Sequence, residues 1–202
     1  MRKIILLFLT MSSSIIFAQT IILDDMFELE FKKVVKNSRF FEIHTSSVVT
    51  ASKGSKKIQF RFKLRSLTKE KEDFDPNKFY MITETYKKRV RPADAKFSYH
   101  GVVNEFDILV NNELTEKEKK KHLYSYDPSV IDTFHKYKRE GYDDINTSLN
   151  FGTKRKPDNK EIYFDHWDLR TSTIDIYFGV PMELTEGTIY YGSEKIIDFQ
   201  VK

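Results

Sequence analysis

The stretch Asp165-His166-Trp167-Asp168 is the part of the sequence richest in side chains able to do chemistry. Successive side chains of a β-strand point to opposite faces, so a strand here would place His166 and Asp168 together on one face. An imidazole and a carboxylate on one face can share a metal ion, or the carboxylate can orient the ring. The competing interpretation, which we favour, is a strand end with a buried Trp167 and a solvated polar face. We therefore take His166 and Asp168 as candidate binding residues and assign no catalytic residue or metal ligand.

The familiar catalytic and metal-binding motifs are absent from the sequence. It has no cysteine and no Gly-x-Ser-x-Gly elbow, and none of its five histidines stands in a His-Glu-x-x-His motif. The run Asp143-Asp144-Ile145-Asn146 lacks the spacing of a calcium-binding loop, although a loop calcium site stays an alternative. We therefore expect no cofactor. A hydrolase with dispersed active-site residues is an alternative function, not the leading one.

Two more candidate binding residues come from the middle of the chain. Tyr142 belongs to a group of tyrosines spread over residues 86–142, and exposed aromatic side chains are typical of recognition surfaces. Arg155 stands in the basic run 154–156, inside a segment, 143–160, that is predicted to be a long loop. Loops on a rigid scaffold often carry recognition. We expect a binding surface where this loop and a helical insertion meet the sheet, with core packing of the tyrosines as the competing interpretation.

Three clusters of cations raise the question of an anionic partner. Arg61, Lys63 and Arg65 share one face of a predicted strand, and residues 87–91 and 117–121 hold the other two clusters. Acidic residues interleave all three clusters, so we favour a solvated surface and predict no nucleic-acid partner. An envelope protein or a surface glycan is the partner that best fits an exported protein, and the sequence does not identify it further.

The first 18 residues predict where the protein goes. Arg2 and Lys3 precede an apolar run over residues 4–17 that ends at Ala18, which is the pattern of a cleaved secretory signal peptide. We predict a signal peptide over residues 1–18, one mature domain over 19–202, and a secreted or periplasmic location. No later segment is apolar enough to span a membrane. The lack of cysteine excludes a lipoprotein anchor and disulfides. Two of the 34 cations leave with the signal peptide, so 32 cations remain against 30 anions.

Most of the mature sequence reads as β-strands. The clearest is Ile58–Arg65, in which apolar and polar side chains alternate strictly, and a preceding turn at 52–55 predicts a hairpin with residues 39–50. The other predicted strands are Phe27–Val35, Lys78–Thr85, Phe106–Val110, Ile162–Trp167, Ser172–Val180, Thr188–Tyr191 and Ile196–Val201.

Two helices interrupt the strands. Asp127-Pro128-Ser129 supplies an N-cap and a proline at the first helical position, apolar residues then recur at helical spacing, and Gly141 follows as a C-cap. Val130, Ile131, Phe134 and Tyr137 recur at helical spacing, and we expect Val130, Phe134 and Tyr137 to face inward. A second, polar helix begins at the capping box formed by Thr115 and Glu118. The insertion over about 114–140 is predicted to cover one edge or end of the sheets.

Short strands bounded by turns, with one helical insertion, predict a mainly β protein, an antiparallel β-sandwich. The segment Ser172–Val180 ends in Phe178-Gly179-Val180-Pro181 and leads to Glu186-Gly187-Thr188-Ile189-Tyr190-Tyr191-Gly192 and a closing strand. This pattern resembles the C-terminal hairpin of telokin-like, immunoglobulin-like β-sandwich domains of secreted Bacteroidota-type bacterial proteins. The resemblance covers about a fifth of the chain, implies an immunoglobulin-like fold and carries no functional residue.

The function that these patterns favour is a secreted or periplasmic binding module without catalytic activity. A hydrolase would require a polar cleft with perturbed carboxylates or histidine. A third alternative, a β-barrel that carries an apolar ligand, would require an open interior lined by aromatic side chains.

Overall fold

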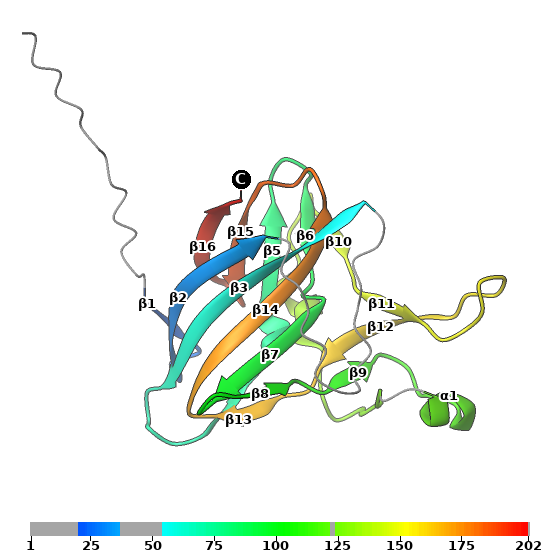
Figure 1. The fold of residues 1–202 in the computed structure, drawn as a ribbon, viewed down its shortest axis with the longest axis horizontal. Helices are drawn as coiled ribbons and strands as arrows, with labels where there is room; N and C mark the ends of the chain where they lie inside the picture. The colour runs from blue at the N-terminus through cyan, green and yellow to red at the C-terminus, as the bar shows by residue number, and fades with distance from the viewer. Residues whose placement is uncertain (1–19, 37–53, 122–123, 202) are drawn as a thin grey trace, which may run out of the picture.

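The computed structural model describes residues 20–36, 54–121 and 124–201, and their main architecture is two β-sheets packed face to face (Figure 1). The six-stranded sheet has the order β1 (Thr20–Leu23), β2 (Phe27–Lys36), β3 (Ser55–Ser66), β14 (Thr171–Pro181), β7 (Asp94–Tyr99) and β8 (Val102–Glu105). The five-stranded sheet has the order β10 (Asp143–Ile145), β6 (Lys88–Val90), β5 (Phe79–Thr83), β15 (Glu186–Tyr191) and β16 (Glu194–Gln200). The β10–β6 pair is parallel and the other pairs in these sheets are antiparallel.

Two smaller sheets and three short helices lie beside the sandwich (Figure 1). One small sheet has the order β11 (Ser148–Asn150), β12 (Asn159–Phe164) and β9 (Ile108–Val110), and the other pairs β13 (Trp167–Leu169) with β4 (Glu72–Phe74). The helices are the 3-10 helix η1 (Pro76–Lys78), the α-helix α1 (Glu116–Lys121) and the 3-10 helix η2 (Thr133–Tyr137). In the described part of the chain, no helix has both the length and the apolar character needed to cross a membrane.

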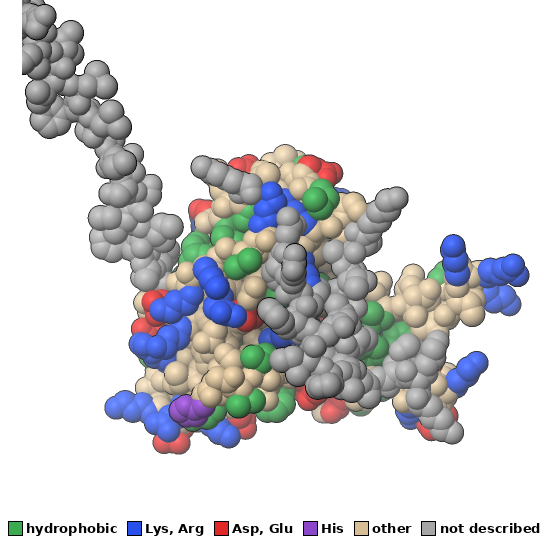
Figure 2. Space-filling model, in the orientation of Figure 1, with side chains coloured by type: hydrophobic (Ala, Val, Ile, Leu, Met, Phe, Trp, Pro, Cys, Tyr) green, Lys and Arg blue, Asp and Glu red, His purple; other side chains and the backbone are tan. Residues whose placement is uncertain are grey.

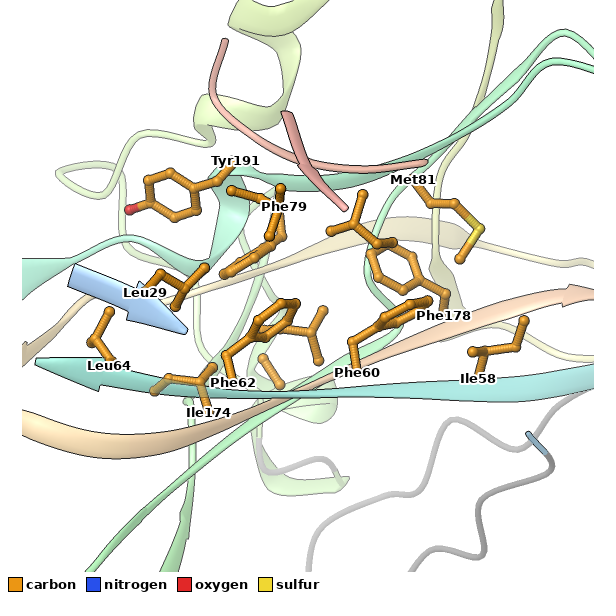
Figure 3. Close-up of a cluster of buried hydrophobic side chains, with 14 of the residues drawn as sticks. Leu29, Ile58, Phe60, Phe62, Leu64, Phe79, Met81, Ile174, Phe178 and Tyr191 are labelled. Carbon is orange, nitrogen blue, oxygen red and sulfur yellow. The ribbon is translucent and has the colours of Figure 1, made fainter. Parts of the chain in front are cut away.

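Aromatic side chains fill the space between the two large sheets (Figure 3). The alternation predicted for β3 is confirmed, because Ile58, Phe60, Phe62 and Leu64 are all fully buried. The Phe60 ring lies 4.8 Å from that of Phe199 on β16, and the Phe62 ring lies 5.3 Å from that of Phe79 on β5. These contacts join the two sheets directly, so the interior is a packed core.

The middle strand of the five-stranded sheet, β5, is buried on both faces. Phe79 and Met81 point into the main core, while Tyr80 and Ile82 point outward and pack with Phe134 of η2 in a separate cluster. The η2 part of the insertion therefore covers the outer face of this sheet, whereas the sequence predicted that the insertion covers an edge or end.

The prediction of a helix that begins directly after Asp127 is wrong in both the start and the length of the helix. The Asp127 carboxylate accepts hydrogen bonds from the backbone N–H and the hydroxyl of Ser129, which closes a local turn, and the helix begins only after Asp132. The Arg89 guanidinium then binds the carbonyl oxygens of Phe134 and Tyr137, at 2.8 and 2.6 Å. Carbonyls held by a side chain from another strand do not accept from the following turn, so the helix stays short.

The polar helix predicted at the Thr115 capping box is confirmed as α1. The Glu118 carboxylate accepts from the Thr115 N–H at 2.7 Å, and the Thr115 hydroxyl accepts from the Glu118 N–H at 3.3 Å. The long loop predicted over 143–160 is wrong in part, because β10 and β11 form within it. The hairpin predicted between 39–50 and β3 lies outside the described residues.

Candidate functional site

A break between two strands decides the geometry of the stretch at 165–168. β12 ends at Phe164 and β13 begins at Trp167, so Asp165 and His166 form the connection between them. The expectation that one continuous strand pairs His166 with Asp168 on a face is therefore wrong. The Trp167 side chain is 38% exposed, so its predicted burial is also wrong. What remains is a strand start that carries an exposed tryptophan, with a histidine placed just before it.

His166 contacts two aspartates from a distant part of the sequence. Its Nδ1 lies 3.0 Å from Oδ2 of Asp73 on β4, and its Nε2 lies 3.4 Å from Oδ1 of Asp75, the N-cap of η1. Asp75 is buried and also accepts hydrogen bonds from the Thr133 hydroxyl at 2.6 Å and from the Asn77 N–H at 2.8 Å. These bonds fix Asp75 between η1 and η2, so His166 is held in one orientation.

These carboxylates set the protonation of His166. The adjacent Asp75, and then Asp73, favour the imidazolium and raise the pKa of His166 to about 9, against the opposing effect of its partial burial. Burial alone would raise the pKa of Asp75, but its contacts with His166, Thr133 and Asn77 lower it. At neutral pH His166 is therefore an imidazolium beside two carboxylates. Its Nδ1 donates to Asp73, while its Nε2 lies 3.4 Å from Asp75 without forming a hydrogen bond.

A groove of about 910 Å³ opens next to this histidine. Its walls are β13 and the inward face of the β7–β8 hairpin, which lie at the same end of the sandwich (Figure 1). The Trp167 ring contacts the Phe97 ring of β7 at 4.9 Å, and Tyr99 continues the aromatic surface toward the tip of the hairpin. Both His166 and Asp168 line this groove, so it brings together two of the four candidate residues.

Charged side chains surround the aromatic surface of the groove. Five carboxylates and three basic side chains line it, which are Glu70, Asp73, Asp107, Asp165 and Asp168 with Lys71, His166 and Arg170. His166 is already engaged by Asp73 and Asp75. The groove is therefore more acidic than the chain as a whole.

The other two candidate residues lie elsewhere. Tyr142 donates to the Glu84 carboxylate and lies under the Lys87 ammonium, which is 5.1 Å from the centre of its ring. Arg155 is exposed in the turn between β11 and β12. Neither residue lines the groove. The binding surface expected where the insertion meets the 143–160 segment is thus not the place where His166 and Asp168 lie.

Each of the three basic clusters contains at least one cation that is paired with a carboxylate. Figure 2 shows Lys and Arg side chains over β2 and β3, where Arg61 forms two 2.7 Å hydrogen bonds with Asp175. In the second cluster Arg89 pairs with Asp144, and in the third Lys119 pairs with Glu116. Pairing of this kind leaves less uncompensated positive charge at these positions.

The geometry gives little support to hydrolysis at His166. A general base at neutral pH must be able to accept a proton, and an imidazolium with a pKa of about 9 is already protonated. Within the described ranges there is no group of three His, Asp or Glu side chains suited to hold a metal ion. The chemistry available in the groove is stacking on aromatic rings together with hydrogen bonding and charge pairing to carboxylates.

Sequence reasoning missed most of the residues that build this site. Asp73, Asp75, Phe97 and Tyr99 come from segments far from residue 166 in the sequence. One signal was present: Asp75-Pro76 has the N-cap and proline pattern that starts a helix, and η1 begins there.

Comparison of the chain with protein-family models, with curated proteins and with solved structures gives no match. The function must therefore be argued from the site.

Proposed function

We propose that this protein is a secreted or periplasmic binding module without catalytic activity, and that its ligand occupies the groove between β13 and the β7–β8 hairpin. One observation carries the proposal: Trp167, the single tryptophan of the chain, is exposed in this groove and rests on the Phe97 ring. An exposed tryptophan ring leaves apolar surface in contact with water. A ligand that covers the ring removes this surface from water, which favours binding.

Two features support binding over the alternatives. A carrier of an apolar ligand needs an open interior, whereas the space between the two sheets is filled by packed side chains. A hydrolase would need a general base, and His166, the histidine of the groove, is already protonated at neutral pH. An envelope protein or a surface glycan is the partner class proposed for the groove. The immunoglobulin-like character of the sandwich, and its kinship with telokin-like domains, belong to the same proposal and are supported by the antiparallel C-terminal hairpin β15–β16.

The fluorescence of Trp167 tests the proposal directly, because no other tryptophan contributes to the emission. The purified chain is titrated with neutral oligosaccharides, with a basic peptide and with an acidic peptide. We expect a saturable change in emission with one class of probe. The variant Tyr99→Ala, in the groove, should weaken that response, while Tyr86→Ala, an exposed tyrosine outside the groove, should not.

Three results would overturn parts of the proposal. If the Trp167 emission changes linearly and without saturation with every probe, the groove is not a binding site for these ligand classes. Turnover of a bound probe would contradict the absence of catalysis. Retention of residues 1–18 on the exported chain, measured by mass spectrometry, would contradict the cleaved signal peptide.

A further inference from the structure

The strand β8 is an edge of the six-stranded sheet that the described residues form. Among the described strands it pairs only with β7. The two strands are joined by the two-residue turn His100-Gly101, in which both residues have positive φ. Such a turn closes on a hydrogen-bonded pair, here Tyr99 and Val102, so hydrogen-bonded pairs then alternate along the ladder. The N–H and C=O of Val103, in the next pair, therefore point away from β7.

The edge has neither lysine nor proline, although it is only four residues long and ends at Glu105. Natural edge strands commonly carry lysine or proline, or are covered by another element. β8 instead begins with Val102 and Val103, whose side chains are 62% and 57% exposed, followed by the uncharged Asn104. An exposed apolar edge of this kind is a template for an added strand.

The same hairpin forms a wall of the groove. Phe97 and Tyr99 of β7 and Asn104 of β8 line it, and Asn104 is the register partner of Phe97. A strand added beside β8 would continue the sheet, so alternate side chains of that strand would point to the groove side. Backbone pairing at the edge and side-chain recognition in the groove would then belong to one ligand.

The charge of the groove selects the side chains of that ligand. Among the described residues, no ion-pair partner faces the side chain of Asp107 or Asp168. Asp168 follows the exposed Trp167 on β13, and both residues line the groove, so an ammonium or guanidinium that covers the Trp167 ring would lie in a groove that also holds carboxylates.

We propose, on the basis of the groove function above, that the occupant is an extended segment of a partner protein with basic residues at alternate positions. This segment adds to β8 as a further antiparallel or parallel strand. Its lysine or arginine side chains enter the groove, where Trp167 supplies an aromatic face and Asp168 and Asp107 supply negative charge.

The test uses short blocked peptides and the full mature chain. One peptide alternates threonine with lysine, and its matched control alternates threonine with glutamate. We expect saturable quenching or shift of the Trp167 emission with the lysine peptide alone, weakened by added salt. Val103→Pro removes the outward N–H at a position outside the β7 hydrogen bonds, and should lower affinity about tenfold or more. Val103→Ala keeps the N–H and should bind within about twofold of the parent.

The charge arm of the experiment uses Asp168→Asn, which should also lower affinity for the lysine peptide about tenfold. Circular dichroism establishes that each variant keeps its sheets. Equal binding of the glutamate peptide, or full affinity in Val103→Pro, would overturn the strand-addition proposal. Saturable binding of an oligosaccharide with no binding of the lysine peptide would also overturn it, while the groove function would stand. If no probe reaches Trp167, both proposals fall together.

Discussion

Asp168 lies directly opposite Asp73 in the antiparallel ladder between β13 and β4. Like charges at facing positions of a ladder repel one another. His166 lies 3.0 Å from Asp73 and offsets that charge, but Asp168 has no such cation among the described residues. A basic ligand at Asp168 would offset repulsion between these facing carboxylates, so we expect substitution of Asp168 to affect stability and binding in opposite directions.

The first prediction concerns this pair. Asp168→Asn should stabilise the folded protein by about 0.5 kcal/mol, because it removes one of the two facing charges. Urea denaturation at low salt measures the change. Glu140→Gln, an exposed carboxylate outside the groove, is the matched control and should leave the free energy of unfolding unchanged. A loss of stability in Asp168→Asn would mean that the carboxylate has a stabilising partner and that no repulsion is stored there.

The second prediction concerns Arg89, whose side chain is fully buried. It pairs with Asp144 through two hydrogen bonds of 2.7 and 2.8 Å, and its guanidinium lies 3.9 Å from the centre of the Phe134 ring. Arg89→Ala should destabilise the fold by about 3–5 kcal/mol, because Asp144 and two backbone carbonyls lose their donor. Arg89→Lys should recover little of this, because an ammonium cannot reproduce the planar fork.

Lys88 provides the control for Arg89, because the two are neighbours on β6. Lys88 pairs with the exposed Asp143 at the surface, and Lys88→Ala should cost less than about 1 kcal/mol. Chemical denaturation of all three variants gives the comparison. Similar small losses at both positions would mean that the Arg89 network does not hold η2 in place.

The strands were predictable where one local pattern settles them. Apolar and polar side chains alternate from Ile58 to Leu64 because one face of β3 packs against the core. This pattern can be recognised from consecutive residues alone. The helix after Asp127 was not predictable in the same way. Asp127-Pro128-Ser129 and Asp75-Pro76-Asn77 carry the same capping signal, yet only the second starts a helix directly, because Arg89 and the Ser129 hydrogen bonds act on the first segment.

The third prediction distinguishes the α-helix predicted after Asp127 from the short helix η2 of the structure. An α-helix from Pro128 would make Ile131 an i,i+3 neighbour of Phe134, whereas in the structure Phe134 is fully buried and Ile131 is 59% exposed. Phe134→Ala should therefore destabilise the protein by about 3–5 kcal/mol. Ile131→Ala should change stability by less than about 0.5 kcal/mol. Comparable losses at the two positions would restore the longer helix, and thermal or urea unfolding decides between them.

The site illustrates a different limit of sequence reasoning. Asp165, His166, Trp167 and Asp168 were visible as a group, but the partners that give them a role were not. His166 meets Asp73 across 93 positions of sequence, and the Trp167 ring meets Phe97 across the end of the sandwich. Contacts between such distant segments follow from how the sheets pack, and a single sequence carries no local sign of them.

The fourth prediction is the pH dependence that His166 gives to stability. Its pKa is about 9 in the folded protein, against about 6.5 for an unperturbed histidine. The folded state therefore holds the proton more tightly, so the stabilisation is complete below about pH 6.5 and is lost as the pH rises through about 9. His166→Asn should abolish this contribution and make the protein less stable at pH 6 than the parent, with the two converging near pH 10.

Another group titrates in the same range with the opposite sign, so the comparison of two proteins is the required readout. Burial lowers the pKa of Lys57 to about 8, and its loss of a proton favours the folded state as the pH rises. Subtracting the unfolding free energies of His166→Asn from those of the parent removes this effect. His100→Asn, in a turn where asparagine tolerates the positive φ, is the control and should follow the parent profile. Parallel profiles for the parent and His166→Asn would mean that His166 is not held as an imidazolium by Asp75 and Asp73, and the base that a hydrolase needs would again be available in the groove.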